Sequence, residues 1–150
     1  ASEKIKMGEK VPLVWPEEQK AAAEILVGVC PFFDLITLPG KPEKEDMLLL
    51  SGRLRNQDVI FAAEYDCWKN ESWLELLRTL EQERLFLLSA RTPYSLLALP
   101  ETKGFFALYS DIPVTMKALG KILNGKASPM GKLPVDLPGL FPAGWGATEF

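Results

Sequence analysis

Short apolar runs alternate with amphipathic stretches along most of the chain. The apolar runs predict strands, and the run at residues 59–63 has no polar interruption, which is typical of a strand buried on both faces. The five predicted strands cover residues 11–15, 34–38, 59–63, 85–88 and 105–109. Because helical patterns fall between them, the order predicts a mostly parallel sheet with right-handed crossovers.

Apolar residues spaced three or four positions apart predict helices in the gaps between these strands. Prolines, carboxylates and a capping asparagine or serine suit the first turns of these helices. The helices are expected to begin at Pro16, Pro42, Asn70 or Ser72, Tyr94, and Asp111 or Pro113. The last helix is expected to end at Asn124 and Gly125, since glycine readily adopts the left-handed cap conformation.

The C-terminal tail, residues 128–146, is dense in proline and glycine. Flanking prolines exclude a central strand there, so residues 132–136 are expected to form an edge strand. Residues 1–10 are expected to be a linker stub and residues 11–150 a single α/β domain. The predicted fold is a three-layer sandwich around a flavodoxin-like sheet.

Composition and charge argue against several classes of function. The 150 residues suit one ordinary domain, and 47% apolar with 25% charged residues is a globular balance. A net charge of −3 provides no concentrated basic surface, so no nucleic-acid partner is expected. With no histidine, the chain lacks the commonest general base and metal ligand, and no metal site is expected. Cys30 and Cys67 are interpreted as small buried hydrophobic residues.

No targeting or membrane segment is expected in this chain. Residues 1–6 are polar and have no signal-peptide apolar region. The most apolar stretch, residues 21–38, carries Glu24, Pro31 and Asp34, so it is not expected to span a membrane. The pattern is compatible with a location in the cytoplasm or outside the cell.

Ligands of open α/β sheets gather at the carboxyl ends of the strands. Here those ends lead into loops that begin at Pro16, Glu64, Ser89 and Ser110. The first loop, residues 15–18, has two carboxylates and no glycine, so it would repel a phosphate. Neither glycine-rich nucleotide motif occurs, and no cofactor is expected. A phosphate-receiver role for Asp66 is disfavoured because no lysine ends the fifth strand.

Four residues in these loops are the candidate substrate-binding residues: Asp66, Trp68, Arg91 and Asp111. Two of them, Asp66 and Asp111, could form a glycosidase-style carboxylate pair, but strand-end and helix-cap roles are favoured. Trp68 could stack on a sugar, pack against another domain or pack within its own loop. Arg91 could clamp a carboxylate in bidentate fashion or, as favoured, tie its loop to a backbone carbonyl.

The C-terminal third carries a specific pattern. Residues 91–100 read RTPYSLLALP, residues 118–135 read ALGKILNGKASPMGKLPV, and residues 142–146 read PAGWG. This succession resembles the C-terminal domain of glycoside hydrolase family 3, in its β-N-acetylglucosaminidase branch. The resemblance covers residues 58–146 well and residues 1–57 only by pattern.

The resemblance implies a longer protein in which an N-terminal (β/α)8 barrel precedes this domain. In that branch, the nucleophilic aspartate and the histidine-bearing acid/base loop belong to the barrel. This chain has no histidine and no barrel, so the resemblance carries over no catalytic residue.

The leading hypothesis is therefore an accessory, non-catalytic domain of a β-N-acetylhexosaminidase-like enzyme. It would pack on the catalytic barrel, and the whole enzyme would act on N-acetylglucosamine-containing glycans such as bacterial peptidoglycan fragments. No activity is expected from this chain alone, although a glycan could contact it. The alternative is a free-standing flavodoxin-like module that binds a small ligand or a protein.

Overall fold

The computed structural model describes residues 9–126. Strands and helices alternate throughout this part of the chain. The strands are β1 Val11–Pro16, β2 Phe33–Leu38, β3 Ile60–Glu64, β4 Leu85–Ser89 and β5 Gly104–Ala107. The α-helices are α2 Lys20–Val29, α3 Lys44–Arg53, α4 Glu71–Thr79, α5 Ser95–Ala98 and α6 Pro113–Leu123. Short 3-10 turns cover η1 Glu17–Gln19, η2 Cys67–Lys69 and η3 Gln82–Arg84.

The five strands form one sheet in the order β2-β1-β3-β4-β5. Every pairing within residues 9–126 is parallel. This is the flavodoxin-like strand order, so the predicted fold class is confirmed. The predicted edge strand at residues 132–136 lies outside the described part of the chain.

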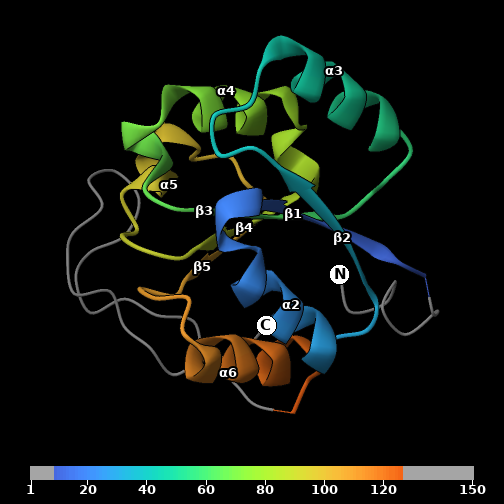
Figure 1. The fold of residues 1–150 in the computed structure, drawn as a ribbon, viewed down its shortest axis with the longest axis vertical. Helices are drawn as coiled ribbons and strands as arrows, with labels where there is room; N and C mark the ends of the chain where they lie inside the picture. The colour runs from blue at the N-terminus through green and yellow to red at the C-terminus, as the bar shows by residue number, and fades with distance from the viewer. Residues whose placement is uncertain (1–8, 127–150) are drawn as a thin grey trace.

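Helices cover both faces of the sheet and produce three layers (Figure 1). One face packs against α2 and α6, and the other packs against α3 and α4. In β3, alternate side chains serve the two cores: Phe61 and Ala63 face α2 and α6, whereas Ile60 and Ala62 face α3 and α4. This explains why the central strand has no polar interruption.

Two predicted helix starts are shifted in the structure. Pro16 is the last residue of β1 instead of the first turn of a helix, because its ψ of 132° is extended. Pro42 precedes α3, which begins at Lys44, because the Asp46 carboxylate accepts a 2.9 Å hydrogen bond from the Glu43 N–H. The predicted asparagine cap of α4 is confirmed, since Asn70 Oδ1 accepts from Trp73 N at 3.3 Å.

The fifth strand lies one to two residues earlier than predicted. β5 ends at Ala107, and Tyr109 adopts a left-handed φ of 62° that is incompatible with a continuing strand. At its start, Gly104 lies so close to β4 that an added Cβ would stand 2.4 Å from Cδ1 of Phe86. Phe86 itself stacks on Phe61 at 4.9 Å, so the glycine allows β5 to pair beside a filled core.

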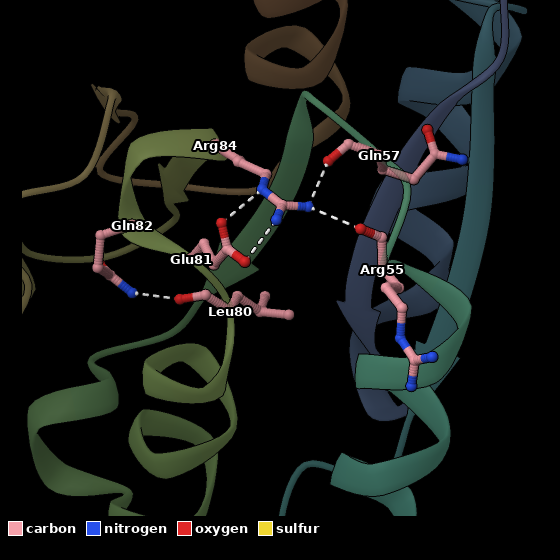
Figure 2. Close-up of polar contacts among 6 residues, drawn as sticks. All are labelled: Arg55, Gln57, Leu80, Glu81, Gln82 and Arg84. Carbon is pink, nitrogen blue, oxygen red and sulfur yellow. Dashed lines mark hydrogen bonds and ion pairs between the residues drawn. The ribbon is translucent and has the colours of Figure 1, made fainter.

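Arg84 ties together two connections at the amino edge of the sheet (Figure 2). Its Nη1 donates to the carbonyl oxygens of Arg55 and Gln57, both at 3.0 Å, and its Nε donates to Glu81 at 2.8 Å. One guanidinium therefore joins the α4–β4 turn to the α3–β3 connection. The opposite, carboxyl edge of the sheet holds the candidate site.

Both cysteines are buried and free, which confirms their interpretation as small core residues. No helix within residues 9–126 is long and apolar enough to cross a membrane.

Candidate functional site

A groove lies at the carboxyl edge of the sheet, between β1 and β3. The chain leaves β1 towards β2 on one side and leaves β3 towards β4 on the other, so the loops diverge at this point. The groove has a volume of about 490 Å3. Its lining comes from the end of β1, from the segments after the first four strands and from the first turn of α4: Pro16, Glu18, Gln19, Pro39, Gly40, Lys41, Tyr65, Cys67, Asn70, Trp73 and Arg91.

Main-chain contacts fix one wall of the groove. Both oxygens of the Glu18 carboxylate accept from the N–H of Gly40, at 3.1 and 2.9 Å. Asn70 Nδ2 donates to the Gly40 carbonyl at 2.7 Å, which links this wall to the loop after β3. A Cβ at position 40 would stand 2.7 Å from Oε2 of Glu18, so glycine allows this close approach.

Tyr65 lines the groove, and its hydroxyl makes two hydrogen bonds. Its hydroxyl accepts from Trp15 Nε1 at 3.1 Å and donates to Asp111 Oδ2 at 2.8 Å. Burial raises the pKa of this phenol, and the adjacent Asp111 carboxylate raises it further. Tyr65 is therefore a neutral phenol whose single proton is committed to Asp111.

Arg91 extends over the ring of Tyr65, with its guanidinium carbon 5.7 Å from the ring centroid. This is a cation–π arrangement, and Arg91 remains exposed to solvent. Its guanidinium makes no ion pair with a carboxylate of residues 9–126. The favoured tie to a backbone carbonyl is absent from the same residues, which corrects that expectation.

Asp66 has a structural role in the loop after β3. It adopts a left-handed conformation, with φ and ψ both 53°, and its Oδ1 accepts from Thr92 N at 3.0 Å and from Thr92 Oγ1 at 2.6 Å. Burial would raise the pKa of Asp66, but the hydrogen bonds from Thr92 outweigh that effect and lower it. Asp66 thus joins the loops after β3 and β4 as an ionised acceptor.

The expectation that Asp111 caps the last helix is wrong. The residue that precedes α6 is Ile112, and no side chain caps the helix there. The carboxylate of Asp111 instead accepts from Tyr65. Asp66 and Asp111 therefore accept hydrogen bonds from different partners, Thr92 and Tyr65.

Trp68 lies outside the groove in an exposed aromatic surface, defined here as Trp68, Tyr94 and Tyr109. These three side chains are 46%, 38% and 43% exposed. Trp68 meets Tyr94 edge to face at 6.3 Å, and its Nε1 donates to Thr92 Oγ1 at 3.3 Å. Lys69 Nζ lies 4.7 Å from the centre of the indole ring. Trp68 is thus tied to the loop after β4 while its ring stays exposed.

Glu64 is a carboxylate that sequence reasoning did not single out. It is fully buried at the end of β3, where it accepts from Cys67 N at 2.8 Å, Ser95 Oγ at 2.6 Å and Ser89 Oγ. Burial, and then the Glu64 charge, raises the pKa of the Cys67 thiol to about 12. The network joins the ends of β3 and β4 to the two segments that follow them, and all four of its residues are buried.

The structure therefore divides the predicted residues between three places. Arg91 lines the groove and Asp111 supports it through Tyr65, whereas Asp66 and Trp68 bind Thr92 outside it. The loops named from the sequence as candidates for the site did not include the loop after β2. Its position at the carboxyl end of a strand was the available signal. Within residues 9–126, no group of three or more acidic, cysteine or histidine side chains could hold a metal ion.

The chain matches no known family model and no curated protein at a significant level. Among solved structures, it is similar to a glycoside hydrolase family 3 β-N-acetylglucosaminidase from Paenibacillus sp. str. FPU-7, with a TM-score of 0.68 and 23% identity over 79% of this chain. It is also similar to a fungal multi-domain family 3 β-N-acetylglucosaminidase that has a GCN5-related glucosamine N-acetyltransferase region. That match has a TM-score of 0.75 and 15% identity over 93% of this chain.

The shared feature is the fold. The match spans only 25% of the Paenibacillus chain and 17% of the fungal chain. The sequence pattern predicted a resemblance to this branch of family 3. The chain is structurally similar to two enzymes of that branch. The most specific part of the sequence pattern, residues 127–146, lies outside the described residues.

Proposed function

We propose that this chain is an accessory, non-catalytic domain of a β-N-acetylhexosaminidase-like glycoside hydrolase. The observation that carries the proposal is the asymmetry of the matches: most of this chain corresponds to a quarter or less of two family 3 β-N-acetylglucosaminidases. A catalytic (β/α)8 barrel would form the remainder, and the whole enzyme would act on N-acetylglucosamine-containing glycans such as bacterial peptidoglycan fragments.

The side-chain chemistry of the domain supports a non-catalytic role. The chain has no histidine. The buried carboxylate Glu64 is enclosed, and the carboxylates of Asp66 and Asp111 are bound by Thr92 and Tyr65. Glycoside hydrolysis needs two carboxyl groups that flank a sugar bond, and these three carboxylates serve the loops instead.

The exposed aromatic surface supports docking against a neighbouring domain. Large aromatic side chains are enriched at protein interfaces and depleted on free surfaces. Trp68, Tyr94 and Tyr109 belong to the loops after β3, β4 and β5, so they lie at the carboxyl edge of the sheet. In this proposal they contact the barrel, and Trp68 is the residue that could also meet the glycan.

The coding sequence upstream of Ala1 provides the first test. We expect it to encode a (β/α)8 barrel with a histidine-bearing loop. The chain alone is expected to release no chromophore from a chromogenic N-acetyl-β-glucosaminide. Robust turnover by the isolated chain, or an upstream region without a barrel, would overturn the proposal.

A barrel expressed separately would test the docking surface. We expect it to bind this chain in trans and to bind a Trp68→Ala, Tyr94→Ala variant at least tenfold more weakly. The matched control is Leu48→Ser, Leu49→Ser, which removes two leucines of α3 that are 73% and 75% exposed. Equal losses for the two variants would argue against the aromatic surface as the interface.

The groove favours a second candidate function, a free-standing module that binds a small ligand or a protein. A concave site at the point where the loops diverge is the usual ligand position in this fold. This alternative predicts an upstream stop codon or signal sequence in place of a barrel.

A further inference from the structure

The groove at the carboxyl edge contains two cationic side chains that have no acidic partner among residues 9–126. Lys41 follows β2 and Arg91 follows β4, so they approach the groove from opposite sides of β1 and β3. Neither makes an ion pair with a carboxylate in the part of the chain that the structure describes.

A contact with Tyr65 favours one position of the Arg91 side chain without a ligand. Its guanidinium lies over Tyr65, and the Tyr65 ring is held through its hydroxyl by Trp15 and Asp111. A guanidinium placed in this way keeps its N–H groups available for a planar, bidentate acceptor. Carboxylates have that geometry, and less side-chain freedom is lost on binding when the cation is already stacked.

The opposite wall provides acceptors. Glu18 is bound through both oxygens to the Gly40 N–H, and the lone pairs that remain are exposed at the groove. Counting Lys41 and Arg91 against Glu18, the lining has one net positive charge. A ligand that places its carboxylate at Arg91 and a hydroxyl donor at Glu18 would satisfy both walls.

From this arrangement we propose that the groove is a binding site for a small hydroxylated carboxylate, a molecule of the size and chemistry of a sugar acid. The volume of about 490 Å3 lies within the range of small-molecule sites. The site binds its ligand without reaction. It does not depend on the proposed accessory function, because every residue that forms it belongs to this chain.

Titration of the 15N-labelled chain with glucuronate tests the site, with glucose as the neutral ligand of the same size. We expect glucuronate to shift the backbone amide of Gly40 and the amides around Tyr65 and Arg91 in a saturable way. Glucose should shift them far less at equal concentration, because it has no carboxylate for Arg91.

Arg91→Gln should weaken glucuronate binding at least tenfold, since a charge-assisted bidentate contact is lost. The matched control is Arg55→Gln, which makes the same charge change at the amino edge of the sheet, where the Arg55 side chain points away from Arg84 (Figure 2). The amide spectrum without ligand shows whether each variant is folded.

Three outcomes would overturn the proposal. These are absence of saturable shifts with glucuronate, equal shifts with glucose, or equal weakening by the Arg91 and Arg55 variants. None of these outcomes depends on whether a barrel binds the chain, so the two proposals fail separately.

Discussion

The hydroxyl of Tyr65 donates a 2.8 Å hydrogen bond to the carboxylate of Asp111, 46 residues later in the chain. The same hydroxyl accepts from Trp15, so one oxygen connects the loops after β3 and β5 to the end of β1. These hydrogen bonds from Trp15 and to Asp111 fix the Tyr65 ring at the groove. The Arg91 guanidinium lies over that ring.

Removal of the Tyr65 hydroxyl oxygen should lower the stability of the fold. Tyr65→Phe keeps the ring but leaves the Trp15 N–H and the Asp111 carboxylate without this partner. We expect the free energy of unfolding to fall by about 1–3 kcal/mol, measured by urea denaturation. Tyr94→Phe removes a hydroxyl from an exposed ring and should change it by less than about 0.5 kcal/mol. Similar changes in the free energy of unfolding for the two variants would contradict a stabilising role of the Tyr65 hydroxyl.

Two glycine-to-alanine variants should have opposite effects on stability. Gly104→Ala places a Cβ 2.4 Å from Phe86, which is stacked on Phe61, and should destabilise the fold by about 1–3 kcal/mol. Gly52→Ala lies in α3 with no atom within 4 Å of the added Cβ. It should stabilise by about 0.5–1 kcal/mol, because alanine favours the helix. Thermal melts of both variants give the comparison, and a neutral Gly104→Ala would show that β5 can move.

Asp66 should make the fold sensitive to acid. Its pKa is lower in the folded protein than the ordinary value of about 4. The stabilisation from this group is therefore fully present above pH ~4 and is lost as the pH falls through the folded pKa.

Asp66→Asn tests this sign, since asparagine tolerates the left-handed conformation but has no charge. At pH 7 the variant should be less stable by about 1–2 kcal/mol, and the difference should shrink below pH ~4. Asp34→Asn, in an exposed ion pair of 3.4 Å with Arg53, is the control and should follow the wild-type pH profile. Parallel pH profiles for wild type and Asp66→Asn would contradict the prediction.

Both thiols should resist modification while the protein is folded. Burial raises the pKa of Cys30 to about 11 and that of Cys67 to about 12, so almost no thiolate is present at pH 8. A chromogenic aromatic disulfide that reacts with thiols should label the native chain only as fast as the protein unfolds. In denaturant it should label both cysteines at once. Rapid labelling of the native chain would place a thiol at the surface.

The sequence pattern predicted the sheet well because period and burial determine it locally. The unbroken run at residues 59–63 marked the central strand, and the parallel sheet followed from alternation with helices. The strand order needed the packing of the whole chain. The end of β5 was placed too late because no propensity indicates that Tyr109 takes a positive φ.

The candidate site was predicted only in outline. The strand ends placed the candidate residues at the carboxyl edge, where a groove lies, and Arg91 is one of its lining residues. The partners of Asp66 and Asp111 come from loops 26 and 46 residues away, so no spacing rule could assign them. Glu64 resembled an ordinary strand-end carboxylate until the structure brought Ser89 and Ser95 against it.

β1 pairs with both β2 and β3, so the first strand of the chain lies inside the sheet instead of at its margin. A truncation of the first 16 residues would thus leave β2 with no neighbour and separate it from the β3-β4-β5 half. Any shortened version of this domain must begin before Val11, because a later start would remove residues of the strand that joins β2 to β3.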